Sequence, residues 1–122
     1  IAEVSNTEID EINILQATRK GMREALLGLK IAPDTVLTDG NMTLDIPFPQ
    51  KSVIHGDALS YSIGAASIIA KVYRDSLMDT LATAFPEYGF DKNKGYGTAA
   101  HNAAIKEVGL CPFHRRTFTK KF

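Results

Sequence analysis

Apolar residues recur at three- and four-residue spacing along two long stretches of the chain, and this spacing predicts two long helices. In the first stretch, residues 7–29, the spaced apolar positions are Ile9, Ile12, Leu15, Met22, Ala25, Leu26 and Leu29. Thr7 with Asp10 has the order of a capping box, which predicts that the helix begins there. Gly21 lies inside the stretch and allows a break in the helix.

The second stretch, residues 62–85, changes character along its length. Its first half, SIGAASIIAKV, is small and apolar on nearly every side, and a helix of that composition is typically buried. We therefore expect this half to pack closely against a sheet. Beyond Tyr73 the pattern becomes amphipathic, and Pro86 is expected to end the helix.

Two short β-branched runs lie between the long helices and predict strands. TVLTD, residues 35–39, stops at a glycine, and KSVIH, residues 51–55, stops at Gly56 and Asp57. Residues 88–97 are rich in glycine and lysine and predict a loop.

A last helix is predicted from Thr98, a good N-cap residue, to Val108, with Gly109 closing it. The alternation of helices and strands indicates an α/β layer fold. Two strands are too few for a stable sheet, so we expect that further strands precede these residues. The start at Ile1, without a methionine, favours the same expectation.

Length and composition fit one globular domain or part of one. The chain has 122 residues, of which 44% are hydrophobic. We expect one partial domain over residues 1–122, in which residues 86–122 form a basic, substrate-binding C-terminal segment. No run approaches the roughly 18 apolar residues that cross a membrane, and no signal peptide opens the chain. The lone Cys111 makes no internal disulfide, which favours a reducing, cytoplasmic location.

Charge is unevenly distributed, although the net charge is zero. Residues 1–60 carry nine acids and five Lys or Arg, a balance of −4. Residues 91–122 carry two acids and seven Lys or Arg, a balance of +5. An acidic half joined to a basic tail is typical of a site that holds a cation on one side and a polyanion on the other. A solvated, charged tail explains the same pattern.

Asp39 and Asp57 are the first candidates for chemistry, because each follows a short apolar strand next to a glycine. If the two strands are neighbours in one sheet, the carboxylates converge at its end. Carboxylate oxygens gathered there suit a hard cation such as Mg²⁺. The pairs DG and GD also mark ordinary turns, and that alternative stays open.

Basic residues supply candidate contacts to a nucleic-acid backbone. Lys71 lies in the apolar half of the second long helix and needs a partner such as a phosphate or a carboxylate. Asp75, one helical turn away, is expected to form an ion pair within the helix. Arg115 and Arg116 suit bidentate phosphate contacts, and Lys94 can reach a phosphate from the glycine loop.

Tyr96 lies between Gly95 and Gly97 in the stretch KNKGYGT. The flanking glycines permit close backbone approach, and the ring can stack on a sugar or base. Its hydroxyl can meet the 2′-hydroxyl that distinguishes RNA from DNA. The three histidines have no metal-ligand spacing, and exposed or hydrogen-bonded structural roles are expected for them.

Six blocks of the sequence, in one order, resemble type 2 ribonuclease H (ribonuclease HII). They cover nearly the whole chain and read EIDEINILQAT, VLTDGN, HGD in place of the usual KGD, SIGAASIIAKVYRD, FPEYGFDKNKGYGT and HRRTF. The resemblance implies a ribonuclease-H-like α/β fold, here incomplete, with C-terminal helices. It implies an endonuclease that cuts the RNA strand of RNA–DNA hybrids and nicks 5′ of ribonucleotides embedded in duplex DNA.

The same resemblance implies a site of four carboxylates that holds two Mg²⁺ or Mn²⁺ ions during hydrolysis. Asp39 in TDGN and Asp57 in HGD match two of the four carboxylates. Tyr96 matches the family tyrosine that senses the 2′-hydroxyl at an RNA–DNA junction. The implied products carry a 5′-phosphate and a 3′-hydroxyl.

One family block, an Asp–Glu pair followed by Gly-Arg-Gly, is not among these 122 residues. The first interpretation is therefore an endonuclease seen here as its C-terminal portion. One alternative is a catalytically inactive fragment that only binds nucleic acid through its basic third. Another is a two-piece assembly in which a separate segment completes the sheet. The sequence leaves the oligomeric state open.

Overall fold

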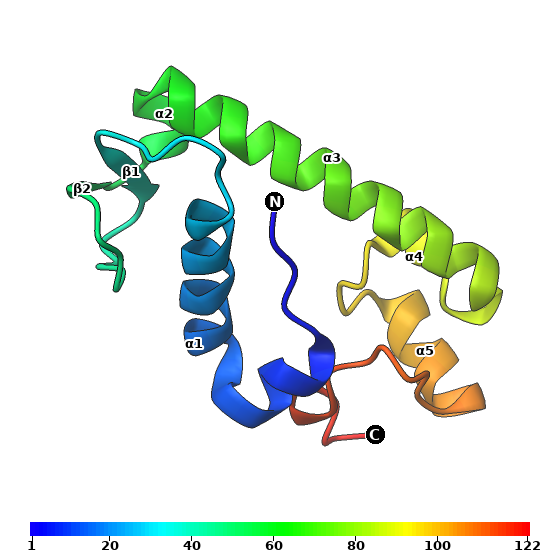
Figure 1. Ribbon diagram of the computed structural model, residues 1–122. Helices are drawn as coiled ribbons and strands as arrows, with labels where there is room; N and C mark the ends of the chain where they lie inside the picture. Colours follow the sequence, from blue (N-terminus) through cyan, green and yellow to red (C-terminus); the bar gives the residue numbers. More distant parts are fainter. The chain divides into compact units, whose positions relative to one another are not determined.

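A computed structural model describes all residues from Ile1 to Phe122. Its elements are the helices α1 (Asn6–Leu27), α2 (Gly56–Leu59), α3 (Tyr61–Ala84), α4 (Phe90–Asn93) and α5 (Ala99–Val108), the strands β1 (Val36–Asp39) and β2 (Gln50–Val53), and the 3-10 turns η1 (Pro86–Tyr88) and η2 (Arg116–Phe118) (Figure 1). The chain forms two compact units, Ile1–Ile69 and Ala70–Phe122, with α3 running through the boundary. No helix is both long and apolar enough to span a bilayer.

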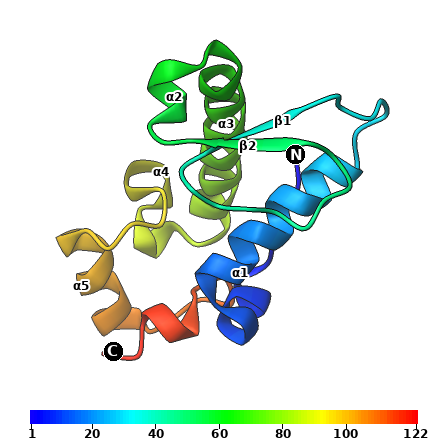
Figure 2. The ribbon, with the colours of Figure 1, turned by 90° about the vertical axis from the view of Figure 1, so that its left-hand side faces the viewer.

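The two strands pair in parallel, with Val36 opposite Gln50 and Asp39 opposite Val53 (Figure 2). Both strands therefore end at the same edge of the sheet, which is the condition for the two carboxylates to converge, although β2 begins and ends earlier than expected. Thr38 and Val36 point into the unit while Leu37 and Asp39 point outward, which is the alternation of a half-buried strand.

Helix α1 breaks at a different residue from the one predicted. Asn13, with φ 69°, interrupts the helix, and its side-chain oxygen accepts the backbone N–H of Gln16 at 3.0 Å. Asn13 thus caps the second half of α1 as an N-cap residue, and Figure 1 shows the change of direction. Leu15, one of the predicted apolar positions, is exposed.

The N-terminal cap of α1 was also assigned to the wrong residue. Ser5, not Thr7, precedes the helix, and its Oγ accepts the N–H of Glu8 at 3.2 Å. The order Ser-x-x-Glu satisfies the capping-box pattern better than Thr7 with Asp10, because the residue at the third helical position is then Glu8.

The expected burial of the first half of α3 is wrong. Of its large apolar residues only Ile63 is buried, whereas Ile68, Ile69 and Val72 are about 60% exposed or more. Size explains the difference: a 24-residue helix is about 36 Å long. A four-residue strand spans only about 13 Å. A sheet of that length is too short to cover the whole apolar face of the helix.

The second unit has its own core, formed by residues from the end of α3 onward. Its buried members are Met78, Tyr88, Phe90, Ile105 and Cys111. Pro86 follows the end of α3 as predicted, and α5 is capped by Thr98, whose Oγ1 accepts the N–H of His101. Residues 88–97 are more ordered than the predicted loop, since η1 and α4 occupy part of them.

Candidate active site

Asp39 and Asp57 lie at one edge of the small sheet in the first unit. Asp39 is the last residue of β1, and Asp57 lies in the first turn of α2, after β2. Asp39 Oδ1 accepts the backbone N–H of Gly56 at 2.9 Å, so the first carboxylate contacts the residue directly before the second. The predicted meeting of the two strand ends is therefore present.

Gly56 makes this close approach possible. A Cβ at position 56 would lie 2.7 Å from Cδ1 of Ile63 and 3.4 Å from Cα of Asp39. Gly64, one turn into α3, faces the backbone oxygen of Asp57 in the same way, with 3.1 Å available for a Cβ. Small residues at 56 and 64 thus let β1, α2 and α3 converge around Asp57.

The two carboxylates suit a hard divalent cation in their donor chemistry. Both side chains are exposed. One oxygen of each accepts a backbone N–H, at 2.9 Å from Gly56 to Asp39 and 3.1 Å from Ala58 to Asp57. Carboxylate oxygen is the ligand type that Mg²⁺ takes. No three His, Cys, Asp or Glu side chains form a metal-binding group in these 122 residues.

The loop around Tyr96, in the second unit, is held by its backbone. The N–H of Tyr96 donates to the carbonyl of Asn93, and its own carbonyl accepts the N–H of Thr98, both at 2.9 Å. Lys94 and Gly95 have positive φ angles of 53° and 88°. A Cβ at Gly95 would approach Cε of Met78 at 3.2 Å, so both conformation and space favour glycine there.

The ring of Tyr96 points away from this scaffold, because the side chain is 73% exposed. The buried Asn93 supports the loop from beneath: its Nδ2 donates to the carbonyl of Tyr88, and its Oδ1 accepts the N–H of Gly95 at 2.8 Å. The arrangement presents one aromatic side chain on a fixed backbone.

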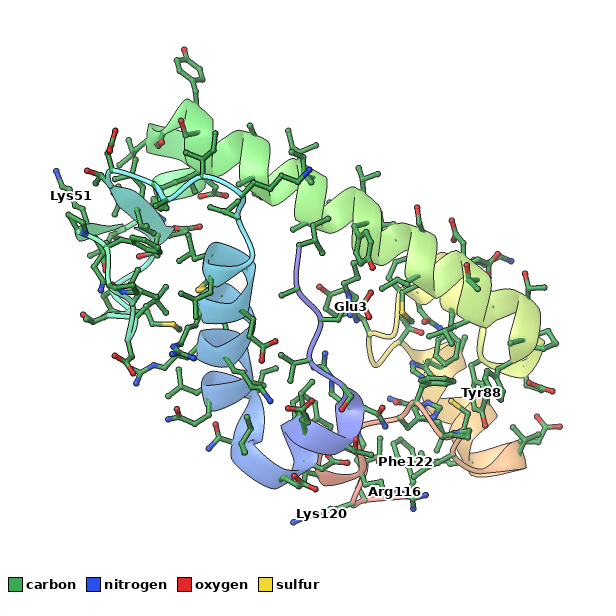
Figure 3. The ribbon with its side chains drawn as sticks, viewed as in Figure 1. Glu3, Lys51, Tyr88, Arg116, Lys120 and Phe122 are labelled. Atoms are coloured by element: carbon green, nitrogen blue, oxygen red, sulfur yellow. The ribbon has the colours of Figure 1, made fainter.

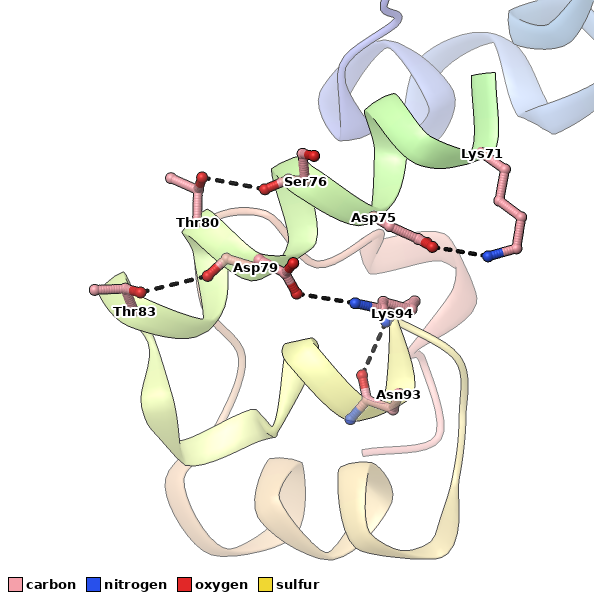
Figure 4. A network of polar contacts seen from close by, with 9 residues as sticks. Lys71, Asp75, Ser76, Asp79, Thr80, Thr83, Asn93 and Lys94 are labelled. Atoms are coloured by element: carbon pink, nitrogen blue, oxygen red, sulfur yellow. Dashed lines mark hydrogen bonds and ion pairs between the residues drawn. The ribbon is translucent and has the colours of Figure 1, made fainter. Parts of the chain in front are cut away.

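Lys71 and Lys94 both have acidic partners in the second unit (Figure 4). Lys71 Nζ donates to Asp75 at 2.7 Å, which confirms the predicted intrahelical ion pair and lowers the pKa of Asp75. Lys71 is exposed, not buried as its apolar neighbours suggested. Lys94 Nζ donates to Asp79 at 2.9 Å, and this hydrogen bond raises the pKa of Lys94. The Lys94–Asp79 pair had no signal in the sequence, because it joins a loop to a helix.

Arg115 and Arg116 lie at the start of η2, in the basic C-terminal part of the chain. The guanidinium of Arg115 stacks over the ring of Phe118, 5.0 Å from its centroid. This cation–π contact orients the arginine. Arg116, labelled in Figure 3, is exposed.

A buried histidine pair in the second unit was not predicted. Nε2 of His101 and Nε2 of His114 are 2.9 Å apart, and both side chains are buried. The rings of Tyr88 and Phe90 flank them, with Tyr88 4.8 Å from the His114 centroid. Tyr88, labelled in Figure 3, donates its hydroxyl to the Gly109 carbonyl at 2.6 Å. Thirteen residues separate the histidines, so no local pattern indicates that they meet.

A parallel sheet edge with two carboxylates, beside a helix whose first turns are rich in small residues, is an α/β arrangement. Comparison with known proteins identifies one family. A model of the family described as ribonuclease HII matches residues 1–121. Ribonuclease HII 1 of Methylibium petroleiphilum is 53% identical over 119 residues, which are 98% of this chain and 60% of that protein.

A second relative and a solved structure are similar to the chain over nearly its whole length. Ribonuclease HII of Chlorobium chlorochromatii is 49% identical over 97% of this chain and 58% of its own length. The crystal structure of ribonuclease H2 from Pyrococcus horikoshii OT3 superposes with a TM-score of 0.75 and 26% identity, over 93% of this chain and 62% of that one. The chain belongs to the ribonuclease HII family, and its fold is the matching part of a ribonuclease-H-like α/β fold. It spans a little over half the length of these curated relatives.

Proposed function

We propose that these residues supply two carboxylates and the ribose-sensing loop of an endonuclease. The enzyme cuts the RNA strand of RNA–DNA hybrids and nicks on the 5′ side of a ribonucleotide embedded in duplex DNA. The observation that carries the proposal is the hydrogen bond from Gly56 to Asp39, because it ties the ends of β1 and β2 together at the position of the two acids. Family membership supports the same reaction class.

Asp39 and Asp57 would hold Mg²⁺ or Mn²⁺ through the carboxylate oxygens that accept no backbone N–H. The bound ions would supply a water activated at neutral pH and would offset charge on the leaving 3′-oxygen. The two acids contribute fixed negative charge at a sheet edge that the Gly56 bond keeps in place. Hydrolysis then leaves a 5′-phosphate and a 3′-hydroxyl.

Substrate contacts are assigned to the second unit. Tyr96 meets the ribose, because its ring is exposed on a loop whose backbone is fixed. Arg115, Arg116 and Lys71 contact phosphates, and such contacts give affinity without reading sequence. Lys94 joins them by exchanging its Asp79 partner for a phosphate.

The partner is therefore a hybrid or ribonucleotide-containing duplex. The balance of +5 over residues 91–122 supports a polyanionic partner. The thiol of Cys111 is free and buried, which fits a reducing compartment and supports action in the cytoplasm.

The test compares two duplexes that differ by one 2′-hydroxyl: a DNA duplex with a single ribonucleotide, and the same duplex in DNA alone. A protein of the relatives' length that contains these residues should cut the first on the 5′ side of the ribonucleotide with Mg²⁺ or Mn²⁺. It should leave the second intact, and EDTA should abolish the cut. Equal cleavage of both duplexes, or cleavage in EDTA, would refute the proposal.

Assays of the 122-residue chain alone distinguish an endonuclease from a fragment that only binds nucleic acid. Salt-dependent binding of a hybrid duplex with no cleavage in Mg²⁺ supports binding as the whole function of this chain. Cleavage by this chain excludes that alternative.

A further inference from the structure

The buried histidine pair connects the Tyr96 loop to the C-terminal part of the second unit through four hydrogen-bonding groups. Nδ1 of His101 lies 2.8 Å from the carbonyl oxygen of Tyr96. The two Nε2 atoms of His101 and His114 are 2.9 Å apart. At the far end, the backbone N–H of Cys111 donates to Nδ1 of His114 at 2.9 Å.

These contacts allow one assignment of protons when both rings are neutral. Because Nδ1 of His114 accepts from Cys111, that ring carries its proton on Nε2. His114 Nε2–H then donates to Nε2 of His101, which must be an acceptor. The proton of His101 is therefore on Nδ1, and it donates to the Tyr96 carbonyl. Every ring nitrogen is used once, and each with the role that its neighbour requires.

The surroundings of His114 favour its neutral form. Burial, and then the neighbouring His101, lower the pKa of His114. Phe90 on α4 carries no charge, and the phenol of Tyr88 from η1 packs edge-on against both rings. A further proton can enter only by breaking one of the three bonds, since no ring nitrogen is left without a partner.

We propose that His101 and His114 are positioning residues for Tyr96: a neutral imidazole relay with fixed tautomers holds the Tyr96 carbonyl and thereby aims the exposed ring. The catalytic part of this inference rests on the proposed function, because it assumes that Tyr96 meets the ribose. Tyr96 as a residue is 73% exposed, so the direction of its ring depends on the backbone more than on side-chain packing.

The first test reads the tautomers directly and does not depend on catalysis. Imidazole ¹⁵N–¹H correlation spectra of this chain at pH 7 should show His114 protonated at Nε2 and His101 protonated at Nδ1. His55, which is exposed, serves as the internal control with averaged ring signals. A His101 ring protonated at Nε2, or a His114 ring protonated at Nδ1, would overturn the proposal.

The second test uses a matched pair of variants at position 101. His101→Leu removes the donor to Tyr96, whereas His101→Asn places an amide N–H near the position of Nδ1. In a protein of the relatives' length, His101→Leu should lower kcat on the single-ribonucleotide duplex by about 10- to 100-fold with little change in KM, because misplacing a group by about 1 Å costs that much. His101→Asn should lose less than about 10-fold.

Equal losses in the two variants, or a loss confined to KM, would overturn the positioning role. If the wild-type protein cuts no ribonucleotide-containing duplex, the proposed function fails, and backbone ¹⁵N relaxation of residues 94–98 decides the relay alone. The loop should then be more mobile in His101→Leu than in His101→Asn. Equal mobility in both would again overturn the relay.

Discussion

The carboxylate of Asp39 accepts the N–H of Gly56, so the last residue of one strand is bonded to the residue before the second acid. Asp39 therefore has a structural role, as the acceptor of this N–H, and a proposed role as a negative charge that holds a metal ion. Substitution can separate the two roles, because a neutral amide oxygen can accept the same N–H while providing no negative charge.

Asp39→Asn should therefore preserve stability and abolish metal-dependent cleavage. We expect cleavage of the single-ribonucleotide duplex to fall by about 100-fold or more, because the charge that holds the metal is removed. Chemical denaturation should show a change in unfolding free energy below about 0.5 kcal/mol. Asp39→Ala is the control and should lose about 1 kcal/mol, since Gly56 then lacks its acceptor. Wild-type cleavage by Asp39→Asn would remove Asp39 from the site.

Tyr96→Phe should damage cleavage at an RNA–DNA junction far more than it damages the fold. The ring is exposed, and the loop is held through its backbone, so loss of the hydroxyl disturbs no packing. Thermal melting should be unchanged, while kcat on the junction falls by about tenfold or more, as expected for a lost bond to the 2′-hydroxyl. An unchanged rate would make Tyr96 an ordinary exposed residue.

The stability of variants at Asn13 should depend on two properties of the new residue: whether it tolerates a positive φ, and whether its side chain can accept the N–H of Gln16. Asn13→Ala loses the bond to Gln16 and places at φ 69° a residue that tolerates positive φ less well than Asn, so we expect a loss of about 2 kcal/mol. Asn13→Gly accepts the backbone angle and should lose less than Ala. Asn13→Asp keeps an oxygen for the cap and should be nearest the wild type. Urea denaturation followed by circular dichroism measures the order, and Ala equal to Asp would contradict it.

Because Lys71 and Asp75 form an ion pair, substitutions at these two residues should change nucleic-acid binding in opposite directions. Lys71→Gln should weaken binding of a hybrid duplex and reduce the slope of log K against log salt by about one. Asp75→Asn should strengthen binding, because it frees the Lys71 ammonium and removes a negative charge. Fluorescence anisotropy over a salt series gives both values. Lys30→Gln, in the first unit, is the charge-matched control, and an equal effect there would indicate nonspecific attraction.

Acid should destabilise the protein through His114. Its pKa is lowered in the fold, mainly by burial, while in the unfolded chain it has the ordinary value of about 6.5. The unfolded state therefore binds more protons below about pH 6.5, so the stability that the neutral ring contributes is complete above that pH and is lost as the pH falls. His114→Asn keeps an acceptor for Cys111 and should flatten the change between pH 7 and 5. Denaturant midpoints at each pH test this, and parallel pH curves would contradict it.

Local rules predicted the elements whose signals lie within a few residues. Thr98 and Gly109 bound α5 as expected, and Pro86 follows the end of α3, because caps and breakers act over one turn. The break at Asn13 escaped prediction because Asn tolerates positive φ less obviously than the glycine at position 21. Contacts beyond the local sequence determine at which of these two residues the helix breaks.

At the candidate site too, the sequence predicted what local signals determine and missed what depends on contacts between distant segments. The sequence placed Asp39 and Asp57 at strand ends, but their convergence depended on the two strands being neighbours, and the structure supplies that parallel pairing. The burial of α3 was not, because periodicity reports what a helix would bury and not whether a neighbour covers it. The His101–His114 contact depends on two segments that share no local pattern.

The way in which Tyr96 is held makes position 96 suitable for a reporter. Its backbone is fixed by Asn93, Thr98 and His101, while its ring is mostly exposed. A fluorescent or fluorinated aromatic amino acid can therefore replace the tyrosine without rebuilding the loop. Its signal would report the arrival of a sugar at the loop before any bond is cut, which separates recognition from chemistry in time.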